Sequence, residues 1–370
     1  MHCLIHIGVH KTGSTAFQIA MSRFRWQLGE LGLLYPAEPF LEFDKFVCHH
    51  GLAGKVIGQP LDQVPAEYIG PNIEQLEQAI DESNPNYIVL SSEEFSTPFA
   101  GRAEDDPLIK MLLRRGCSIS VVAMIRPQVE LLQSSYIEGV MAFFNYVKFK
   151  EYLALAIAQP FFNYSRRLSP WTSSSKFSFV AVPYTKALQH QRLAETILRA
   201  GGIPDEIINA AGVSTSGGVN PNPGAMTVAA VRYLVPNLPR LQFDPLRDRL
   251  KGFVFEEAER RGWLAVPYRG YSKSDVDHVR KHFQKSNSGF AKRHWGEKWS
   301  DVFGVGARSE WKSNELDLET ISDSVREELE SFGKAIEAHL ATMRAEVPEV
   351  ETTARVKKRR IRVKKSRSAS

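Results

Sequence analysis

The chain has 370 residues, of which 43% are hydrophobic and 24% are charged, as is usual for a globular protein that folds in water. It contains no apolar run of about 18 residues, which argues against a membrane-spanning helix. The first apolar segment begins within a few residues of Met1, which leaves no room for a signal peptide. Three widely spaced cysteines fit neither a disulfide framework nor a zinc site, so we expect a cytoplasmic protein.

The net charge of +5 is a property of the C-terminus. Residues 355–370 contain nine Lys and Arg residues and no acidic residue, and the remaining 38 basic and 42 acidic residues give −4. A segment this basic cannot bury enough apolar surface to fold, so we expect residues 346–370 to form a disordered tail. The tail could contact a polyanion or a membrane surface weakly, or serve only to keep the protein in solution.

The first predicted elements are a buried strand at residues 4–9, a turn that contains Gly13, and a helix that runs from Ser14 to about residue 31. A strand, a glycine turn and a helix N-terminus present backbone N–H groups and a positive dipole end to an anion. Lys11 adds a full charge within the turn. The sequence therefore predicts a phosphate-binding site at six consecutive residues: His10, Lys11, Thr12, Gly13, Ser14 and Thr15.

Further strands and helices alternate along the chain. Strands are expected at residues 32–36, 87–90, 119–125 and 177–182, and helices at 73–80, 108–115, 130–152, 188–200 and 316–343. This alternation predicts an α/β fold with a parallel sheet flanked by helices, followed by a mostly helical C-terminal part. We expect one domain over residues 1–345, with its core at 1–205 and the helical part at 206–345.

The loop differs from the Walker pattern of nucleoside triphosphatases. Gly8 and Gly13 have the Walker spacing, but Ser14 stands where that pattern has its lysine, and Lys11 comes earlier. The two best later strands end without the aspartate that would hold Mg²⁺. These differences favour a phosphate that is bound without a metal. The order Lys-Thr-Gly-Ser-Thr at residues 11–15 resembles the 5′-phosphosulfate loop of sulfotransferases that use 3′-phosphoadenosine-5′-phosphosulfate (PAPS).

A second motif strengthens the resemblance. Arg126 ends the strand at 119–125, and Ser134 follows it by eight residues in the next helix, with Ser135 as an alternative. In the sulfotransferase family, a pair at this spacing binds the 3′-phosphate of PAPS. The resemblance covers the first 200 residues or so, and segments at 220–237 and 286–295 resemble later parts of bacterial members. It implies a P-loop-like fold of the nucleotide-kinase type and an acceptor on a carbohydrate or glycolipid.

Sulfuryl transfer needs a cation at the leaving phosphate oxygen and a base for the acceptor's proton. Lys11 is placed for the first role. Glu93 is our candidate for the base, because it follows the strand at 87–90 where several branches of the family carry a glutamate. Glu94 is the alternative, and a third choice is a histidine in the loop or at Cys48-His-His50.

The adenine of PAPS would need a flat apolar slot. Tyr184 follows a strand that resembles the adenine side of the family's site. Further candidates lie late in the chain: Phe290 and Trp295 for stacking, and Lys292 and Arg293 for the 3′-phosphate.

Two other classes of function remain open. One is a P-loop kinase or nucleotide hydrolase, against which the missing lysine and aspartate argue. The other is a non-catalytic nucleotide-binding or nucleic-acid-binding protein that uses the basic tail.

Overall fold

The computed structural model describes residues 1–9, 11–36, 48–49, 52–53, 73–96, 102–185, 188, 192–214, 222–238, 241, 244, 246–304 and 311–346. The chain divides into two compact units, each made of three segments. We call the first the sheet unit; it comprises Met1–Ser135, Tyr152–Asn220 and Tyr271–Trp311. We call the second the helical unit; it comprises Tyr136–Glu151, Pro221–Gly270 and Lys312–Ser370. The segments interleave, whereas the sequence predicted one core followed by one helical part. The single-domain interpretation stays a prediction, and the basic tail from residue 347 onward lies outside the described residues.

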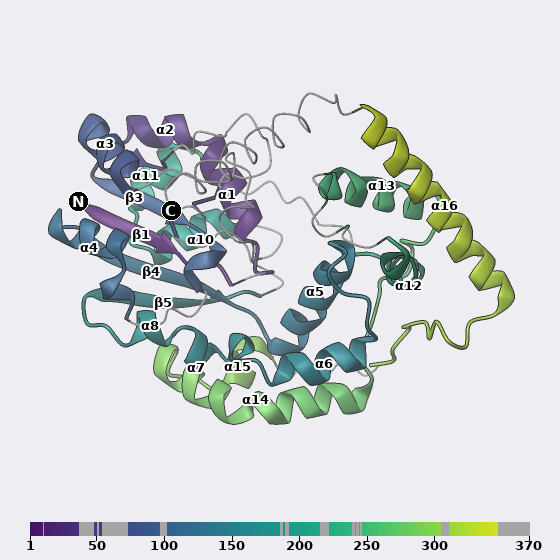
Figure 1. Cartoon of the computed structure of the whole chain (residues 1–370). Coiled ribbons are helices and arrows are strands. Elements are labelled where there is room, and N and C mark those ends of the chain that lie inside the picture. The colour runs from purple at the N-terminus through teal and green to yellow at the C-terminus, as the bar shows by residue number, and fades with distance from the viewer. Residues whose placement is uncertain are drawn as a thin grey trace, which may run out of the picture. The chain divides into compact units, whose positions relative to one another are not determined.

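The sheet unit is built on five parallel strands in the order β2-β3-β1-β4-β5 (Figure 1). The strands are β1 (His2–His6), β2 (Leu33–Leu34), β3 (Tyr87–Ser91), β4 (Ser118–Ile125) and β5 (Phe177–Pro183). All five lie where the sequence predicted strands, and the predicted α/β class with a parallel sheet, flanking helices and a mostly helical C-terminal part is confirmed. In the register, Leu4 of β1 pairs with Val89 of β3 and with Ser120 of β4.

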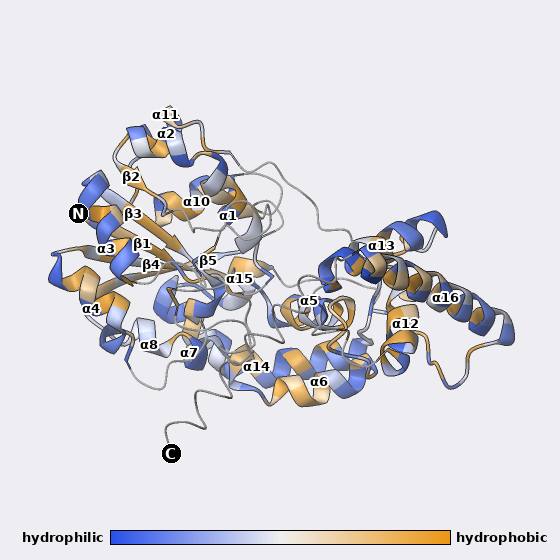
Figure 2. Cartoon of the chain, turned by 45° about the horizontal axis from the view of Figure 1, so that its top comes forward, coloured by the Kyte–Doolittle hydropathy of each residue, from blue (hydrophilic) through white to orange (hydrophobic). Residues whose placement is uncertain are grey.

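Helices cover the sheet, which explains why its strands are almost continuously apolar in sequence. One face of the sheet contributes Leu4 of β1 and Val122 and Met124 of β4 to a single core cluster. That cluster includes residues of four helices: α1 (Ser14–Arg23), α2 (Arg25–Glu30), α10 (Leu193–Ala200) and α11 (Asp205–Ala210). Figure 2 shows the strands as mostly hydrophobic and the helices as mixtures of hydrophobic and hydrophilic residues.

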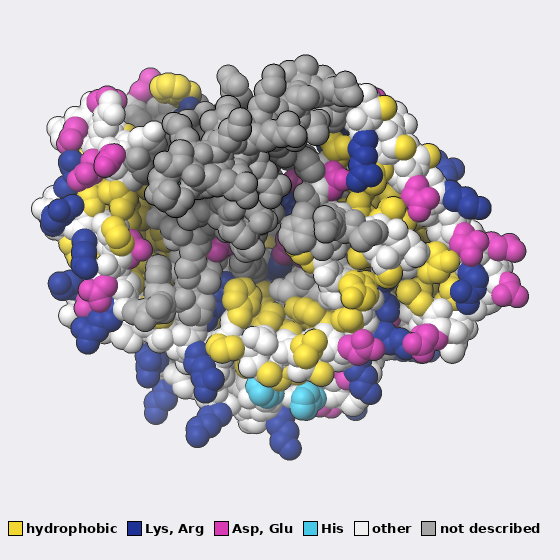
Figure 3. All heavy atoms as spheres, in the orientation of Figure 1, with side chains coloured by type: hydrophobic (Ala, Val, Ile, Leu, Met, Phe, Trp, Pro, Cys, Tyr) yellow, Lys and Arg dark blue, Asp and Glu magenta, His cyan; other side chains and the backbone are white. Residues whose placement is uncertain are grey.

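The remaining helices of the sheet unit are α3 (Ile73–Ser83), α4 (Pro107–Arg114), α7 (Tyr164–Arg167), α8 (Ser169–Thr172), α14 (Lys273–His294) and α15 (Trp299–Phe303). Two more helices, α5 (Gln128–Met141) and α6 (Phe149–Ile157), each have residues in both units. A hydrogen bond from Trp295 Nε1 to Ala181 O, 2.7 Å long, fixes the end of α14 beside β5. Figure 3 shows Lys and Arg side chains gathered along the edge where α14 lies.

Four predicted helices have different bounds in the structure. The first is divided at Phe24 into α1 and α2. The helix predicted at 130–152 is interrupted after α5, where Phe143 has a φ of 62°, a left-handed conformation that ends a helix. The helix predicted from 188 has α10 beginning at Leu193, because Arg192 also has a left-handed φ, of 64°. The helix predicted at 316–343 begins at Asp323.

The helical unit contains α12 (Ala225–Leu234), α13 (Arg247–Arg260) and α16 (Asp323–Glu346). Both α12 and α13 pack against α16. The buried residues of α16, from Leu329 through Phe332, Ile336 and Leu340 to Met343, recur every three or four positions and so form one apolar stripe.

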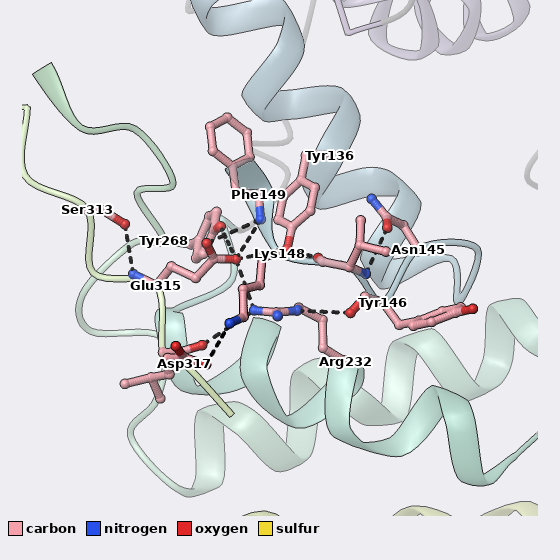
Figure 4. A network of polar contacts seen from close by, with 12 residues as sticks. Tyr136, Asn145, Tyr146, Lys148, Phe149, Arg232, Tyr268, Ser313, Glu315 and Asp317 are labelled. Atoms are coloured by element: carbon pink, nitrogen blue, oxygen red, sulfur yellow. Dashed lines mark hydrogen bonds and ion pairs between the residues drawn. The ribbon is translucent and has the colours of Figure 1, made fainter. Parts of the chain in front are cut away.

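A polar network centred on Glu315 lies within this unit (Figure 4). The Glu315 carboxylate accepts hydrogen bonds from Arg232 Nη1 at 2.9 Å and from the Phe149 backbone N–H at 2.9 Å. The hydroxyls of Tyr136 and Tyr268 also donate to it, each at 3.1 Å. Arg232 is 3% exposed, so the charge of Glu315 balances a charge that is removed from water.

All three cysteines, Cys3, Cys48 and Cys117, are buried free thiols. Of the helices that the structure describes, none is both long enough and apolar enough to cross a bilayer.

Candidate functional site

The candidate site lies at the carboxyl ends of three neighbouring strands. Strand β1 is hydrogen-bonded to β3 on one side and to β4 on the other. The chain passes from β1 toward β2 and β3, and then crosses to β4 on the opposite side. In parallel sheets, ligands bind at the edge where the direction of winding reverses. The predicted loop follows β1, Glu93 follows β3 and Arg126 follows β4, so the topology brings them to the same edge.

The loop between β1 and α1 has the backbone of an anion-binding turn. Lys11 and Gly13 are both left-handed, with φ values of 67° and 84°. The hydroxyl of Thr12 donates to the carbonyl of Val9 and closes the turn on itself. Helix α1 begins at Ser14, and its first intrahelical bond runs from Phe17 N to Gly13 O, 3.0 Å. Because no side chain caps this N-terminus, the first backbone N–H groups of α1 keep their capacity to bind an anion.

Ser14 gives a second indication of a ligand at this loop. Its side-chain oxygen is buried and has no hydrogen-bond partner among the residues that the structure describes. Buried hydroxyls are normally hydrogen-bonded, so an orphan at an uncapped helix N-terminus fits a bound anionic oxygen. A Cβ on Gly8 would lie 2.1 Å from Ser14 Oγ, so Gly8 leaves the space that this hydroxyl occupies. Thr15 is exposed, and His10 lies outside the described residues.

Arg126 reaches from the end of β4 to the loop, although 115 residues separate it from Lys11. Its Nη1 donates to the backbone carbonyl of Lys11 at 2.9 Å and to Ser134 Oγ at 3.1 Å. The hydroxyl of Tyr164 bonds the backbone of Arg126 and fixes the point from which the side chain extends. Thus the structure brings together the loop, Arg126 and Ser134.

Glu130 belongs to this site and was not anticipated from the sequence. Its carboxylate, in the first turn of α5, pairs with Arg126 Nε at 3.2 Å. The guanidinium therefore uses Nε for Glu130 and Nη1 for the loop and Ser134. In the described part of the chain Nη2 has no hydrogen-bonding partner, so it can donate to a ligand. Arg126 lies between β4 and α5, so no helical spacing in the sequence indicated this pair.

Glu93 and Glu94 begin a 3₁₀ turn, η2 (Glu93–Ser96), directly after β3. Both are half-buried. The Oε2 atom of Glu93 accepts a hydrogen bond from Gln18 Nε2 at 3.2 Å. Glu93 also lies close to the loop, since a Cβ on Gly8 would be 3.3 Å from Glu93 Cγ. The backbone N–H of Glu94 bonds the side chain of Ser92 at 3.1 Å.

The backbone of this turn is fixed by two residues that sequence reasoning missed. Arg167 of α7 is fully buried and donates from Nε to Ser96 O at 3.0 Å and from Nη2 to Ser96 Oγ. Trp171 Nε1 donates to Phe95 O at 2.8 Å. Burial lowers the pKa of Arg167 to about 10, and the charges of Tyr164, Glu94 and Glu93 oppose that shift. Nothing in the local sequence distinguishes Arg167 from the solvent-exposed arginine before it.

The histidines near the site lie in different environments. Both ring nitrogens of His49 bind the backbone: Nδ1 accepts from Ser91 N at 2.9 Å, and Nε2 lies 3.1 Å from Pro36 O. This arrangement gives His49 a structural role at the end of β3. His50, like the histidine of the loop, lies outside the described residues. His6 of β1 is fully buried, and burial lowers its pKa to about 3, so its imidazole is neutral at ordinary pH.

The residues considered for the adenine divide into two groups. Tyr184 lies beside the loop, because a Cβ on Gly13 would be 3.2 Å from its hydroxyl, and the Arg126 guanidinium is 5.8 Å from its ring centroid. Phe290 and Trp295 instead pack against each other, with ring centroids 5.6 Å apart. Lys292 and Arg293 are exposed on the last turn of α14; no contact places these four at the loop.

No three His, Cys, Asp or Glu residues of the described ranges are arranged to hold a metal ion. A hollow of about 420 Å³ lies at the opposite, amino end of the sheet, between Met1, Asp81 and Arg115, and none of the predicted site residues lines it.

The fold and the site define an α/β protein in which an uncapped helix N-terminus follows the central strand and an arginine from the end of the adjacent strand is hydrogen-bonded to the loop between them. No protein-family model matches the chain, and no curated protein matches it in sequence.

Proposed function

We propose that this protein is a PAPS-dependent sulfotransferase that transfers a sulfuryl group to an acceptor hydroxyl, with a carbohydrate or glycolipid as the acceptor class. One observation carries the proposal. The guanidinium of Arg126 is bonded to the Lys11 carbonyl at 2.9 Å and to Ser134 at 3.1 Å, beside an uncapped helix N-terminus. Two groups that favour anions thus lie next to each other, as a nucleotide with phosphates at two positions requires.

The residues present fit the two phosphate ends of such a nucleotide. The first N–H groups of α1 and the orphan hydroxyl of Ser14 suit the 5′-phosphate. Arg126 Nη2 and Ser134 suit the 3′-phosphate, since guanidinium groups bind phosphates with strong charge-assisted hydrogen bonds. Tyr184, next to both groups, offers an aromatic ring at the nucleoside between them.

PAPS would supply the sulfuryl group, whose bond to the 5′-phosphate oxygen breaks as the bond to the acceptor oxygen forms. Lys11 and the positive end of α1 stabilise the negative charge that develops on the leaving phosphate oxygen. Glu93 takes the proton from the acceptor hydroxyl, because it is the half-buried carboxylate nearest Gly8 at the start of the loop. Glu94 shares the turn and is the alternative base.

Isothermal titration calorimetry in the presence of EDTA tests the proposal. We expect adenosine 3′,5′-bisphosphate to bind at least 30-fold more tightly than adenosine 5′-monophosphate, since one charge-assisted phosphate contact contributes about 2 kcal/mol. Tighter binding of ATP, or no preference for the 3′-phosphate, would favour a kinase-like or non-catalytic protein. Sulfuryl transfer from labelled PAPS to a panel of glycans then identifies the acceptor.

The Ser14→Ala variant should weaken both nucleotides equally, because both carry the 5′-phosphate that Ser14 is proposed to bind. Ser22→Ala, in the same helix but near its C-terminal end, is the matched control and should bind like the wild type.

A further inference from the structure

Gln18 is a polar residue on the buried side of α1, where its neighbours Phe17 and Met21 belong to the hydrophobic core. Its side chain is 5% exposed. The Nε2 atom of Gln18 lies 3.2 Å from Ser91 Oγ and 3.2 Å from Glu93 Oε2, so its two N–H hydrogens can serve both oxygens. A buried amide is costly unless it is hydrogen-bonded. The Gln18 amide is hydrogen-bonded to Glu93, the carboxylate to which we assign proton abstraction.

The contacts of Gln18 continue into the centre of the sheet. Ser91 Oγ, at the end of β3, lies 2.8 Å from His6 Nδ1 on β1. His6 is fully buried beside Phe17, with ring centroids 4.7 Å apart. The far end of the chain of contacts is therefore embedded in packed core, which holds Ser91 and Gln18 in one arrangement.

The backbone of Glu93 is already fixed from the other side. The hydroxyl of Ser96 lies 2.7 Å from Glu93 O and 3.0 Å from Gly8 O, and Arg167 holds Ser96 by two hydrogen bonds. This arrangement joins the turn of the proposed base to Gly8, which lies between β1 and the proposed phosphate-binding residues. With the backbone fixed, the direction of the Glu93 carboxylate depends on its side-chain torsions, and the hydrogen bond from the Gln18 amide to Glu93 Oε2 is one contact that restricts them.

We propose that Gln18 is a positioning residue that fixes the working direction of the Glu93 carboxylate. The proposal rests on the proposed function. In general, loss of a hydrogen-bond donor disfavours the ionised form of a carboxylate. The titratable groups around Glu93 in the described part of the chain include the neutral His6 of β1, Glu94 on the same turn and the buried Arg167 of α7.

Two variants separate positioning from packing. Gln18→Leu keeps a side chain of similar length but removes the amide, and should lower kcat roughly 10- to 100-fold with the affinity for adenosine 3′,5′-bisphosphate unchanged within about twofold. The acid limb of the kcat–pH profile should move to higher pH. Gln18→Glu places a second carboxylate beside Glu93 and should move that limb further, by about one pH unit or more, because two adjacent carboxylates cannot both ionise easily. Gln27→Leu and Gln27→Glu, at an exposed position of α2, are the matched controls and should leave both readouts unchanged.

A double-mutant cycle gives the decisive result. In a Glu93→Gln background, Gln18→Leu should cause no further loss of kcat, because the group that it positions has been removed. An additional loss as large as in the wild type, or an unchanged acid limb in both Gln18 variants, would overturn the proposal.

A measurement independent of turnover keeps the two proposals apart. Infrared spectroscopy should show that the carboxylate band that disappears in Glu93→Gln is shifted in frequency in Gln18→Leu, because the carboxylate has lost a hydrogen-bond donor. If that shift is present but no sulfuryl transfer is found, the proposed function fails and the positioning contact stands. If sulfuryl transfer is found without the shift, the positioning role of Gln18 fails.

Discussion

Replacement of Arg126 by glutamine tests the site most directly, and the structure sets the size of the effect. The guanidinium has two separate roles: Nη1 holds the Lys11 carbonyl at 2.9 Å, while Nη2 is available for a ligand. Loss of the contact with Lys11 loosens the loop and should cost about 1–2 kcal/mol of affinity for any nucleotide with a 5′-phosphate. Loss of a charge-assisted bond to the 3′-phosphate should cost a further ~2–4 kcal/mol, and only for nucleotides that carry it.

Calorimetry with two ligands separates the roles. In Arg126→Gln, adenosine 5′-monophosphate should bind roughly 5- to 30-fold more weakly, and adenosine 3′,5′-bisphosphate should lose an additional factor of roughly 30 to 900. Arg102→Gln is the matched control, because the Arg102 side chain is 79% exposed and belongs to the same unit. Equal losses for the two nucleotides would show that Arg126 serves only to hold the loop, and the assignment of the 3′-phosphate to it would be wrong.

Four further outcomes follow from the contacts described above. Lys11→Ala should reduce kcat far more than it weakens binding of the product nucleotide, since the charge it meets develops in the transition state; equal losses in single-turnover rate and calorimetric affinity would contradict this role. Glu93→Gln should bind the bisphosphate normally and lose sulfuryl transfer, whereas retained transfer would move the base to Glu94. His6, whose pKa is lowered from 6.5 to about 3, makes the protein less stable as the pH falls below 6.5, because the unfolded chain binds a proton that the folded one does not. At pH 5 the loss in the free energy of unfolding amounts to about 2 kcal/mol. Urea unfolding of His6→Asn should lack this loss, and the same dependence of stability on pH in the variant and the wild type would refute the role of His6. Glu315→Ala should destabilise the fold by about 3–5 kcal/mol in the same assay, because the buried Arg232 loses its counter-charge. Glu319→Ala, at an exposed position, is the control and should change the stability little.

The positions of the strands could be read from the sequence because parallel strands buried on both faces are short apolar runs with turn residues at their ends. The start of α1 at Ser14 could also be predicted, because a glycine turn precedes a helical pattern there, whereas phosphate binding by residues 10–15 stays a prediction. Helix ends were harder to predict. The break after α5 depends on the left-handed conformation of Phe143, for which an aromatic side chain gives no local signal.

The partners of the site residues could not be predicted, because they are set by tertiary contacts. Arg167 comes from a short helix far along the chain and acts on Ser96 through its backbone carbonyl and hydroxyl. Gln18 had a faint signal, since it interrupts an apolar stripe that includes Phe17 and Met21. A polar side chain at such a position must find a buried partner, but the sequence does not say that the partner is Glu93.

The Glu315 network gathers four donors from different parts of the helical unit, at Tyr136, Phe149, Arg232 and Tyr268. Each donor loses a hydrogen bond if the carboxylate moves away, so movement of one part disturbs the contacts of the others. We therefore expect the parts around Glu315 to open together. The rate of deuterium uptake at the Phe149 amide would then report the free energy of that opening.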